Sequence, residues 1–189
     1  MTGLRTLSIL ALALPVAAAS SEPARHGAPA ARPAPGDCPP QAGESDAVPR
    51  YADYPAPRRV RGWAAPVLAS REARLYRSTL GAEVANGPNF AGDYTLAAWG
   101  CGHACTSAAI VAARSGRVFF PAQLRRIATD HVGTWDGGRA LRYRGLRFCR
   151  DSRLLAVVGG SAGHAGATYF EWTGTALREI PVAAGAAHH

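Results

Sequence analysis

Beyond residue 93, the sequence divides into short apolar segments separated by turn-forming residues. The segments cover residues 94–99, 107–113, 118–120, 140–144, 146–149, 154–158, 167–172 and 176–180. Each has the length of a strand, and many of the residues are aromatic or β-branched, as strands favour. Most connections are short and rich in Gly, Ser or Asp, so consecutive strands are expected to pair antiparallel. The pattern predicts a mainly β (α+β) fold, an antiparallel meander curled into a barrel or a sandwich.

One helix is expected on the N-terminal side of these strands. Ser70 is suited to cap its first turn, and apolar residues recur at four-residue spacing from Tyr76 to Val84. An Asn-Gly-Pro sequence at 86–88 ends the pattern, because glycine and proline do not continue a helix. A further helical turn is expected over residues 123–127. The fold therefore combines one N-terminal helix with the sheet.

The first 19 residues have the organisation of a cleavable secretory signal. Arg5 supplies a positive charge, an apolar run covers residues 7–14, and the small residues Ala17 and Ala19 precede the expected cleavage site. The apolar run is too short to cross a bilayer, which takes about 20 residues. We therefore expect a periplasmic or secreted protein that begins near Ser20 and has no membrane span.

Composition divides the mature chain into three parts. Residues 20–57 are rich in Ala, Pro, Gly and Ser, which is typical of a disordered linker. Residues 58–182 are expected to form a single globular domain, and residues 183–189 a disordered tail. From residue 58 onward the chain has 17 arginines against eight acidic residues, a formal charge of +9. This charge favours anionic partners, although no motif for specific nucleic-acid binding is present.

Four cysteines would enter an oxidising compartment after export, where disulfide pairing is the default. Three connectivities are open to four cysteines, and the sequence does not choose among them. We favour Cys101–Cys105, because these two are close in the chain. The second disulfide would then be Cys38–Cys149.

Residues 101–105 include side chains that could bind a metal ion or take part in catalysis. The two thiolates and His103 could bind zinc or copper, with His131 or Asp93 completing the site. The second cysteine pair of a structural zinc site is missing, so we predict no metal and no cofactor. An enzyme that uses Asp93, His103 and His131 is one alternative function. The sequence at 159–163 matches a hydrolase nucleophile elbow, but a strand pattern follows it where the elbow requires a helix.

Two motifs resemble those of a family of small exported proteobacterial proteins. Residues 87–96 read GPNFAGDYTL and residues 99–105 read WGCGHAC, and the family has approximately G-P-N-F-A-G-H-Y-T and W-G-C-G-x-x-C. The likeness extends over roughly residues 63–181. It implies export and one domain but no particular activity. The candidate functional residues of these motifs are Asn89, Phe90, Asp93, Trp99 and His103.

A structural role is the simpler interpretation of the first motif. Phe90 would enter the core, and Gly92 would permit a tight entry into the next strand. One motif position departs from the family pattern, since Asp93 stands where the family has histidine. Any role of an imidazole there would not apply to this chain.

An arginine-rich stretch at residues 139–153 is the candidate anion-binding site. In the strand expected at 140–144, Arg142 and Arg144 share one face, and Arg147 would continue this positive ridge on the next strand. Rows of guanidinium groups bind phosphate and carboxylate through paired hydrogen bonds. An ordinary solvated strand face is the alternative interpretation.

These observations favour an exported, disulfide-braced, non-catalytic domain that binds an anionic envelope polymer or an envelope protein. One alternative is an inhibitor or immunity-type protein against a cell-wall hydrolase. In that case the loop at residues 100–106 or the loop at 159–166 would enter the target's cleft. The other alternative is the enzyme described above, which we favour less.

Overall fold

The computed structural model of the chain describes residues 38, 48–57, 61–130, 143–159 and 166–182. The expected signal sequence, most of the expected linker and the expected tail lie outside these residues. The elements in chain order are η1 (Tyr51–Asp53), α1 (Arg71–Leu75), α2 (Arg77–Ala85), β1 (Tyr94–Gly102), β2 (Cys105–Ala112), β3 (Val118–Phe119), η2 (Ala122–Leu124), β4 (Ile127–Ala128), β5 (Leu146–Phe148), β6 (Leu154–Val158), β7 (Ala167–Trp172) and β8 (Leu177–Ile180).

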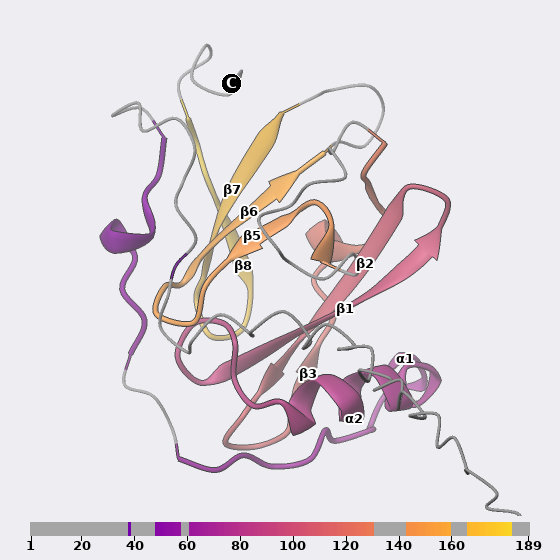
Figure 1. Cartoon of the computed structure of the whole chain (residues 1–189). Helices are drawn as coiled ribbons and strands as arrows, with labels where there is room; N and C mark the ends of the chain where they lie inside the picture. The colour runs from indigo at the N-terminus through magenta and orange to yellow at the C-terminus, as the bar shows by residue number, and fades with distance from the viewer. Residues whose placement is uncertain (1–37, 39–47, 58–60, 131–142, 160–165, 183–189) are drawn as a thin grey trace, which may run out of the picture. The chain divides into compact units, whose positions relative to one another are not determined.

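Two antiparallel sheets of four strands each make the described fold mainly β (Figure 1). In the first sheet, β2 pairs with β1 on one side and with both β3 and β4 on the other. The second sheet is a meander in the order β5-β6-β7-β8. No pairing joins the two sheets among the described strands, so they do not form a closed barrel there. Of the two predicted arrangements, the sandwich is the one that fits.

The two sheets share one apolar core, to which both contribute alternate residues. Leu96 and Ile110 come from the first sheet, and Leu155 and Phe170 come from the second. Leu96, Ile110 and Leu155 have no measurable exposure to solvent. Burying a side chain of this size contributes about 1.5–3 kcal/mol, so this shared core is a principal source of stability.

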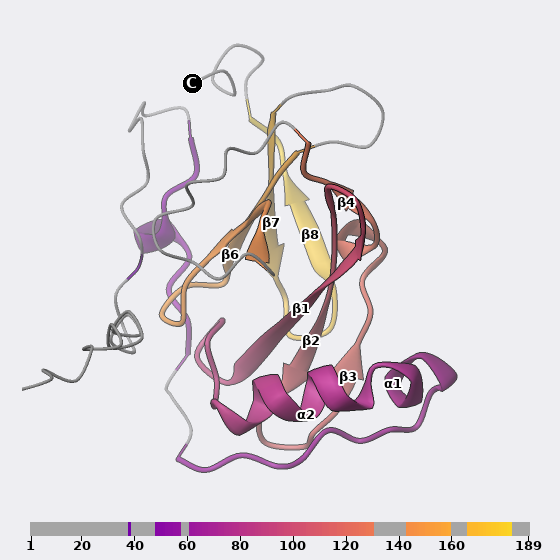
Figure 2. The same cartoon turned by 45° about the vertical axis from the view of Figure 1, so that its right-hand side comes forward.

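Each sheet is covered on its outer face by a different part of the chain (Figure 2). Leu80 and Val84 of α2 pack on the first sheet, against its residues Ala97, Ala109 and Val111. On the second sheet, the described N-terminal residues Cys38, Val48 and Tyr51 pack against Leu154 and Tyr169. The described layers are thus helix, sheet, sheet and N-terminal segment.

The expected helix is present, but it is interrupted at Tyr76. Ser70 caps α1 as predicted, because its hydroxyl accepts a hydrogen bond from the backbone N–H of Ala73 at 2.9 Å. The ring of Tyr76 stacks on Trp99 of β1 with ring centroids 4.1 Å apart. This contact lies at the junction of α1 and α2 and holds it against the sheet. No helix in the described ranges is long and apolar enough to cross a bilayer.

Two of the smaller sequence predictions need correction. Residues 140–142 lie outside the described part of the chain, and Tyr143 to Gly145 form a turn where the end of a strand was expected. The turn is possible because Gly145 has a positive φ of 79°. The helical turn expected at 123–127 is the shorter η2, and Ile127 already belongs to β4.

An extended segment, residues 61–69, leads into α1, and we call it the strap. The backbone N–H of Ala64 donates to the carbonyl of Ala113, and that of Val67 donates to the carbonyl of Gly116, both at 2.8 Å. Gly116 has φ of 67°, and a Cβ atom there would lie 2.0 Å from the carbonyl oxygen of Ala65. The strap can therefore approach the β2–β3 turn only because residue 116 has no side chain.

Gly116→Ala should destabilise the protein far more than Gly62→Ala. Both glycines have a positive φ, but a Cβ atom at Gly62 meets nothing within 4 Å. We expect a loss of about 1 kcal/mol for Gly62→Ala, from backbone strain alone, and about 3 kcal/mol or more for Gly116→Ala. Urea unfolding of the two variants measures the difference. Equal losses would contradict the close approach of the strap at Gly116.

Candidate binding surface

Asn89 holds β1 in place with both polar atoms of its side chain. Its Oδ1 accepts from the backbone N–H of Leu96 at 2.7 Å, and its Nδ2 donates to the carbonyl of the same residue at 3.1 Å. Nδ2 also lies 3.4 Å from the hydroxyl of Tyr143, which donates to the buried carboxylate of Glu83 at 2.5 Å. Asn89 thus belongs to a network that joins α2, β1 and the Tyr143 turn.

The residues after Asn89 connect the two sheets. Phe90 is fully buried in the shared core, as expected. The backbone N–H of Ala91 donates to the backbone carbonyl of Ser152 at 3.2 Å. The backbone N–H of Gly92 donates to the backbone carbonyl of Arg150 at 2.6 Å. Ala91 and Gly92 reach these partners with positive φ angles of 47° and 77°. The first motif therefore serves the fold, since it fixes the start of β1 to the segment between β5 and β6.

Asp93 and Trp99 also have structural partners. The Asp93 carboxylate accepts from Nε of Arg114 at 2.9 Å, and so neutralises an arginine of the β2–β3 turn. Trp99 packs against Tyr76, as described above, and meets Phe120 edge to face at 6.5 Å between ring centroids. Asp93 Oδ2 and the Trp99 ring are therefore engaged within the fold, while Asp93 Oδ1 and Trp99 Nε1 are buried without a hydrogen-bond partner in the described part of the chain.

The second motif closes the tip of the β1–β2 hairpin. Cys101 lies at an irregularity in the register of β1 and forms a disulfide with Cys105 of β2, with the Cα atoms 5.1 Å apart. The backbone N–H of Thr129 donates to the carbonyl of Ala104 at 2.7 Å and braces the turn. His103 is exposed at the tip. Because the two sulfur atoms are bonded to each other, neither is a thiolate that could bind zinc or copper.

The second disulfide, Cys38–Cys149, ties the N-terminal segment to the residue that follows β5. Cys149 is buried beside Tyr51 and Leu154 on the outer face of the second sheet. Both cysteine pairs favoured from the sequence are therefore bonded in the structure. Within the described ranges, no group of three His, Cys, Asp or Glu side chains is placed to hold a metal ion.

The residues proposed for an enzyme are not brought together. Asp93 precedes the nine-residue strand β1, and His103 follows it. At about 3.3 Å per residue, the two lie about 30 Å apart, so they do not share a pocket. His131 lies outside the described residues. Apart from Gly159, the elbow-like sequence at 159–163 lies outside the described residues. The described elements on either side of it, β6 and β7, pair antiparallel, so the next described element is a strand and not the helix that a hydrolase elbow requires.

Glu171 illustrates how the fold uses a carboxylate. It is buried on β7 and accepts hydrogen bonds from both Arg178 and Arg153. The hydrogen bond from Arg178 is the largest influence that holds the pKa of Glu171 below its ordinary value, and it outweighs the opposing effect of burial. Glu171 stays ionised near neutral pH and neutralises two arginines of the domain.

The expected arginine ridge does not form among the described residues. Arg142 lies outside them, and Arg144 belongs to a turn instead of a strand. Arg147 lies on β5, opposite Ala156 in the register. Because Leu146 and Phe148 on either side of it face the shared core, Arg147 faces the outer side of the sheet. The described arginines of this stretch therefore make no continuous row on adjacent strands.

A different arginine-rich surface lies at α1, the start of α2 and the adjoining strap, and it was not predicted from the sequence. We call it the α1 face and define it as Arg71, Arg74, Leu75 and Arg77 together with Val67 and Leu68 of the strap. Residues at i, i+3 and i+4 lie on neighbouring positions of a helix surface, and Arg71, Arg74 and Leu75 all line one open cleft along α1. Ala73 lies on the opposite side of α1, is 1% exposed and belongs to the apolar cluster that contains Leu80 and Val84 of α2.

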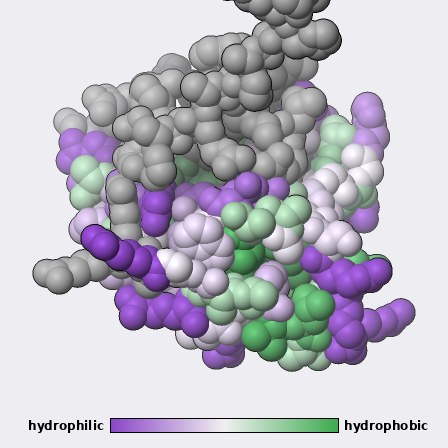
Figure 3. Space-filling view, turned by 60° about the horizontal axis from the view of Figure 1, so that its bottom comes forward, coloured by the Kyte–Doolittle hydropathy of each residue, from purple (hydrophilic) through white to green (hydrophobic). Residues whose placement is uncertain are grey.

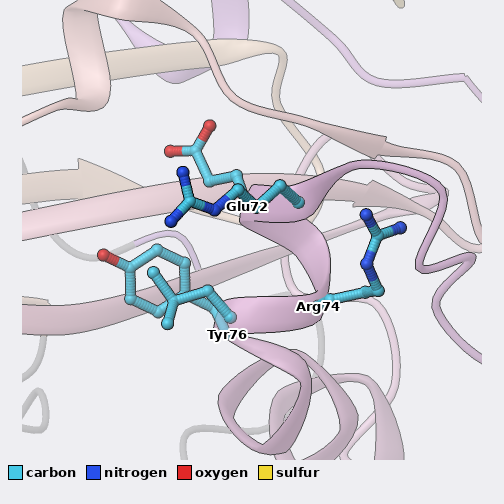
Figure 4. A pocket seen from close by; sticks show the side chains of 5 residues that line it. Glu72, Arg74 and Tyr76 are labelled. Atoms are coloured by element: carbon cyan, nitrogen blue, oxygen red, sulfur yellow. The ribbon is translucent and has the colours of Figure 1, made fainter.

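Backbone carbonyls fix two of these arginines in place. Arg74 donates to the carbonyls of Leu68 and Ala69 at 3.2 and 2.9 Å, and Arg77 donates to the carbonyl of Arg74 at 3.3 Å. Figure 4 shows Arg74 on one side of α1 and the side chains of Glu72 and Tyr76 on the other. An open cleft of about 670 Å³ runs along the helix, and the described residues that line it are Arg71, Glu72, Arg74, Leu75 and Tyr76.

The positive charge of the α1 face is not neutralised by the described acidic residues. Glu72, the acidic residue of α1, forms a salt bridge with Arg125 at 2.8 Å. Arg71, Arg74 and Arg77 make no salt bridge within the described part of the chain. Three guanidinium groups therefore remain open to an external anion.

Exposed apolar side chains accompany these arginines. Leu75 is 69% exposed, Val67 51% and Leu68 36%, and Trp63 at the start of the strap is 46% exposed. Figure 3 shows strongly hydrophilic and hydrophobic surface side by side on this face of the molecule. The signal was present in the sequence, since Leu75 falls outside the Tyr76–Leu80–Val84 stripe and lies one turn after Arg71.

Comparison of the chain with protein-family models, with curated proteins and with solved structures found no match.

The two disulfides should contribute unequally to stability. In the chain-entropy account, a cross-link stabilises more when it closes a longer loop. The bonded cysteines are separated by 111 residues in Cys38–Cys149 and by four in Cys101–Cys105. Cys38→Ala/Cys149→Ala should therefore cost about 5 kcal/mol and Cys101→Ala/Cys105→Ala about 2 kcal/mol. Denaturant unfolding measures both values, and a larger loss for the hairpin pair would contradict this assignment.

Proposed function

We propose that the protein is an exported, non-catalytic domain that binds an anionic partner through the α1 face. The observation that carries the proposal is the presence of three arginines without acidic partners on one exposed surface, two of them held by backbone carbonyls. Guanidinium groups fixed in this way lose less conformational freedom on binding phosphate or carboxylate.

Export is supported by the N-terminal sequence and by the disulfides. Both disulfides are compatible with the periplasm or the extracellular space, where such bonds persist. Envelope polymers at these locations carry phosphate and carboxylate groups. A domain with a formal charge of +9 from residue 58 onward would be attracted to them over a long range at low ionic strength.

A salt titration with labelled polyphosphate tests the proposed surface. The protein is used in the form that an exporting host makes from the full-length chain, and its mass should correspond to cleavage near Ser20. Each arginine–phosphate contact adds about 0.7 to the slope of log affinity against log salt concentration. Arg71→Gln/Arg77→Gln should therefore weaken binding and lower that slope by about 1.4.

The matched control removes two arginines from the ridge predicted from the sequence. Arg142→Gln/Arg144→Gln has the same net charge as the α1 double variant. We expect the control to bind polyphosphate like the unmodified protein, with circular dichroism confirming that both variants are folded. Equal effects of the two double variants, or a larger effect of the control, would contradict the assignment of binding to the α1 face.

One observation favours the inhibitor or immunity-type function as a second candidate. The β1–β2 tip is closed by the Cys101–Cys105 disulfide, is braced by Thr129 and presents His103 to solvent. A rigid projecting loop of this kind suits insertion into an enzyme cleft, because little conformational entropy is lost on binding. Binding through the tip would be unaffected by Arg71→Gln/Arg77→Gln.

A further inference from the structure

We propose that the anionic partner of the α1 face is the surface of a bilayer that contains anionic phospholipid. In this arrangement Leu75 enters the headgroup region, and the arginines of the α1 face contact lipid phosphates. The inference rests on the proposed function, because it names the partner class of the same surface.

The α1 face combines exposed apolar side chains with positively charged ones, and a bilayer surface offers hydrocarbon and phosphate close together. Leu75 follows Arg71 by one helical turn, and Leu68 next to Val67 provides a carbonyl that accepts from Arg74. Hydrocarbon and phosphate lie in adjacent layers at a membrane interface, so a mixed surface can satisfy both kinds of side chain at once. Arginine suits this position, since its apolar stem can lie along hydrocarbon while its charged end stays at the phosphates.

A soluble polyanion would explain only part of the surface. It would pair with the arginines but would leave Leu75 and Val67 exposed to water at 69% and 51%. Apolar surface of this kind is stabilised when it leaves water, and lipid hydrocarbon provides that environment. The exposed apolar residues therefore favour a lipid surface over a purely hydrophilic polymer.

A stable protein partner is less well matched to the α1 face. Such interfaces take about 20–30 residues from each side and need close shape complementarity. The α1 face has only three exposed apolar side chains, those of Val67, Leu68 and Leu75, beside its arginines. A bilayer requires no shape complementarity, and a weak apolar contact combined with a basic patch is sufficient for reversible binding.

Cosedimentation with two kinds of vesicle tests the inference. One kind contains phosphatidylglycerol and phosphatidylcholine in equal parts, and the other contains phosphatidylcholine alone. We expect binding to the anionic vesicles only. Leu75→Ser should weaken this binding about tenfold and leave polyphosphate binding unchanged, since the substitution alters no charge. Arg71→Gln/Arg77→Gln should weaken vesicle binding about 25-fold, at about fivefold per arginine, and Arg142→Gln/Arg144→Gln should have no effect.

The outcomes separate this inference from the proposed function. If Leu75→Ser binds anionic vesicles as tightly as the unmodified protein, or if polyphosphate binds and vesicles do not, the bilayer is the wrong partner and the anion-binding function stands. If the unmodified protein binds neither vesicles nor polyphosphate, both proposals are wrong. Leu75 is exposed, so its replacement by serine should not prevent folding.

Discussion

Among the described residues, two backbone hydrogen bonds link the turn before β1 in the first sheet to the segment between β5 and β6 in the second, and much of the structure depends on them. The N–H groups of Ala91 and Gly92 donate to carbonyls between β5 and β6, while Phe90 enters the core that both sheets share. Buried backbone donors need such partners, and these are reached through two consecutive residues with positive φ. The link orients β1, and β1 in turn carries Trp99, on which the α1–α2 junction rests.

This link between the sheets indicates that the motif at residues 87–96 has a structural role. Asn89, Asp93 and Trp99 are polar or aromatic, as binding residues often are, yet each has a partner within the fold. By contrast, Arg71, Arg74 and Arg77, on α1 and at the start of α2, have no acidic partner among the described residues. In many binding domains, a rigid framework of sheets holds the segment that carries the binding residues.

Local features of the sequence predicted much of the fold. Alternating apolar segments located most strands, Ser70 marked the start of the helix, and chain proximity identified the Cys101–Cys105 pair. The positively charged surface of the domain could not be predicted in the same way, because its arginines and acidic residues are brought together by segments that are distant in the sequence. Arg142 and Arg144 were expected to share a strand face, but Tyr143 and Gly145 form a turn there. Glu72, the acidic residue of α1, pairs with Arg125, which is distant in the sequence, so the sequence alone did not show which charges of α1 are neutralised.

We propose that the α1 face binds anions, whereas the two motifs serve the fold. The most direct measurement is a titration with polyphosphate followed by NMR of the arginine side-chain Nε–H groups and the backbone amides. We expect the signals of Arg71, Arg74 and Arg77 to shift first, while the amides of residues 101–105 stay unchanged. Early shifts at the hairpin tip or at Arg144 and Arg147, with the α1 signals unmoved, would contradict this proposal.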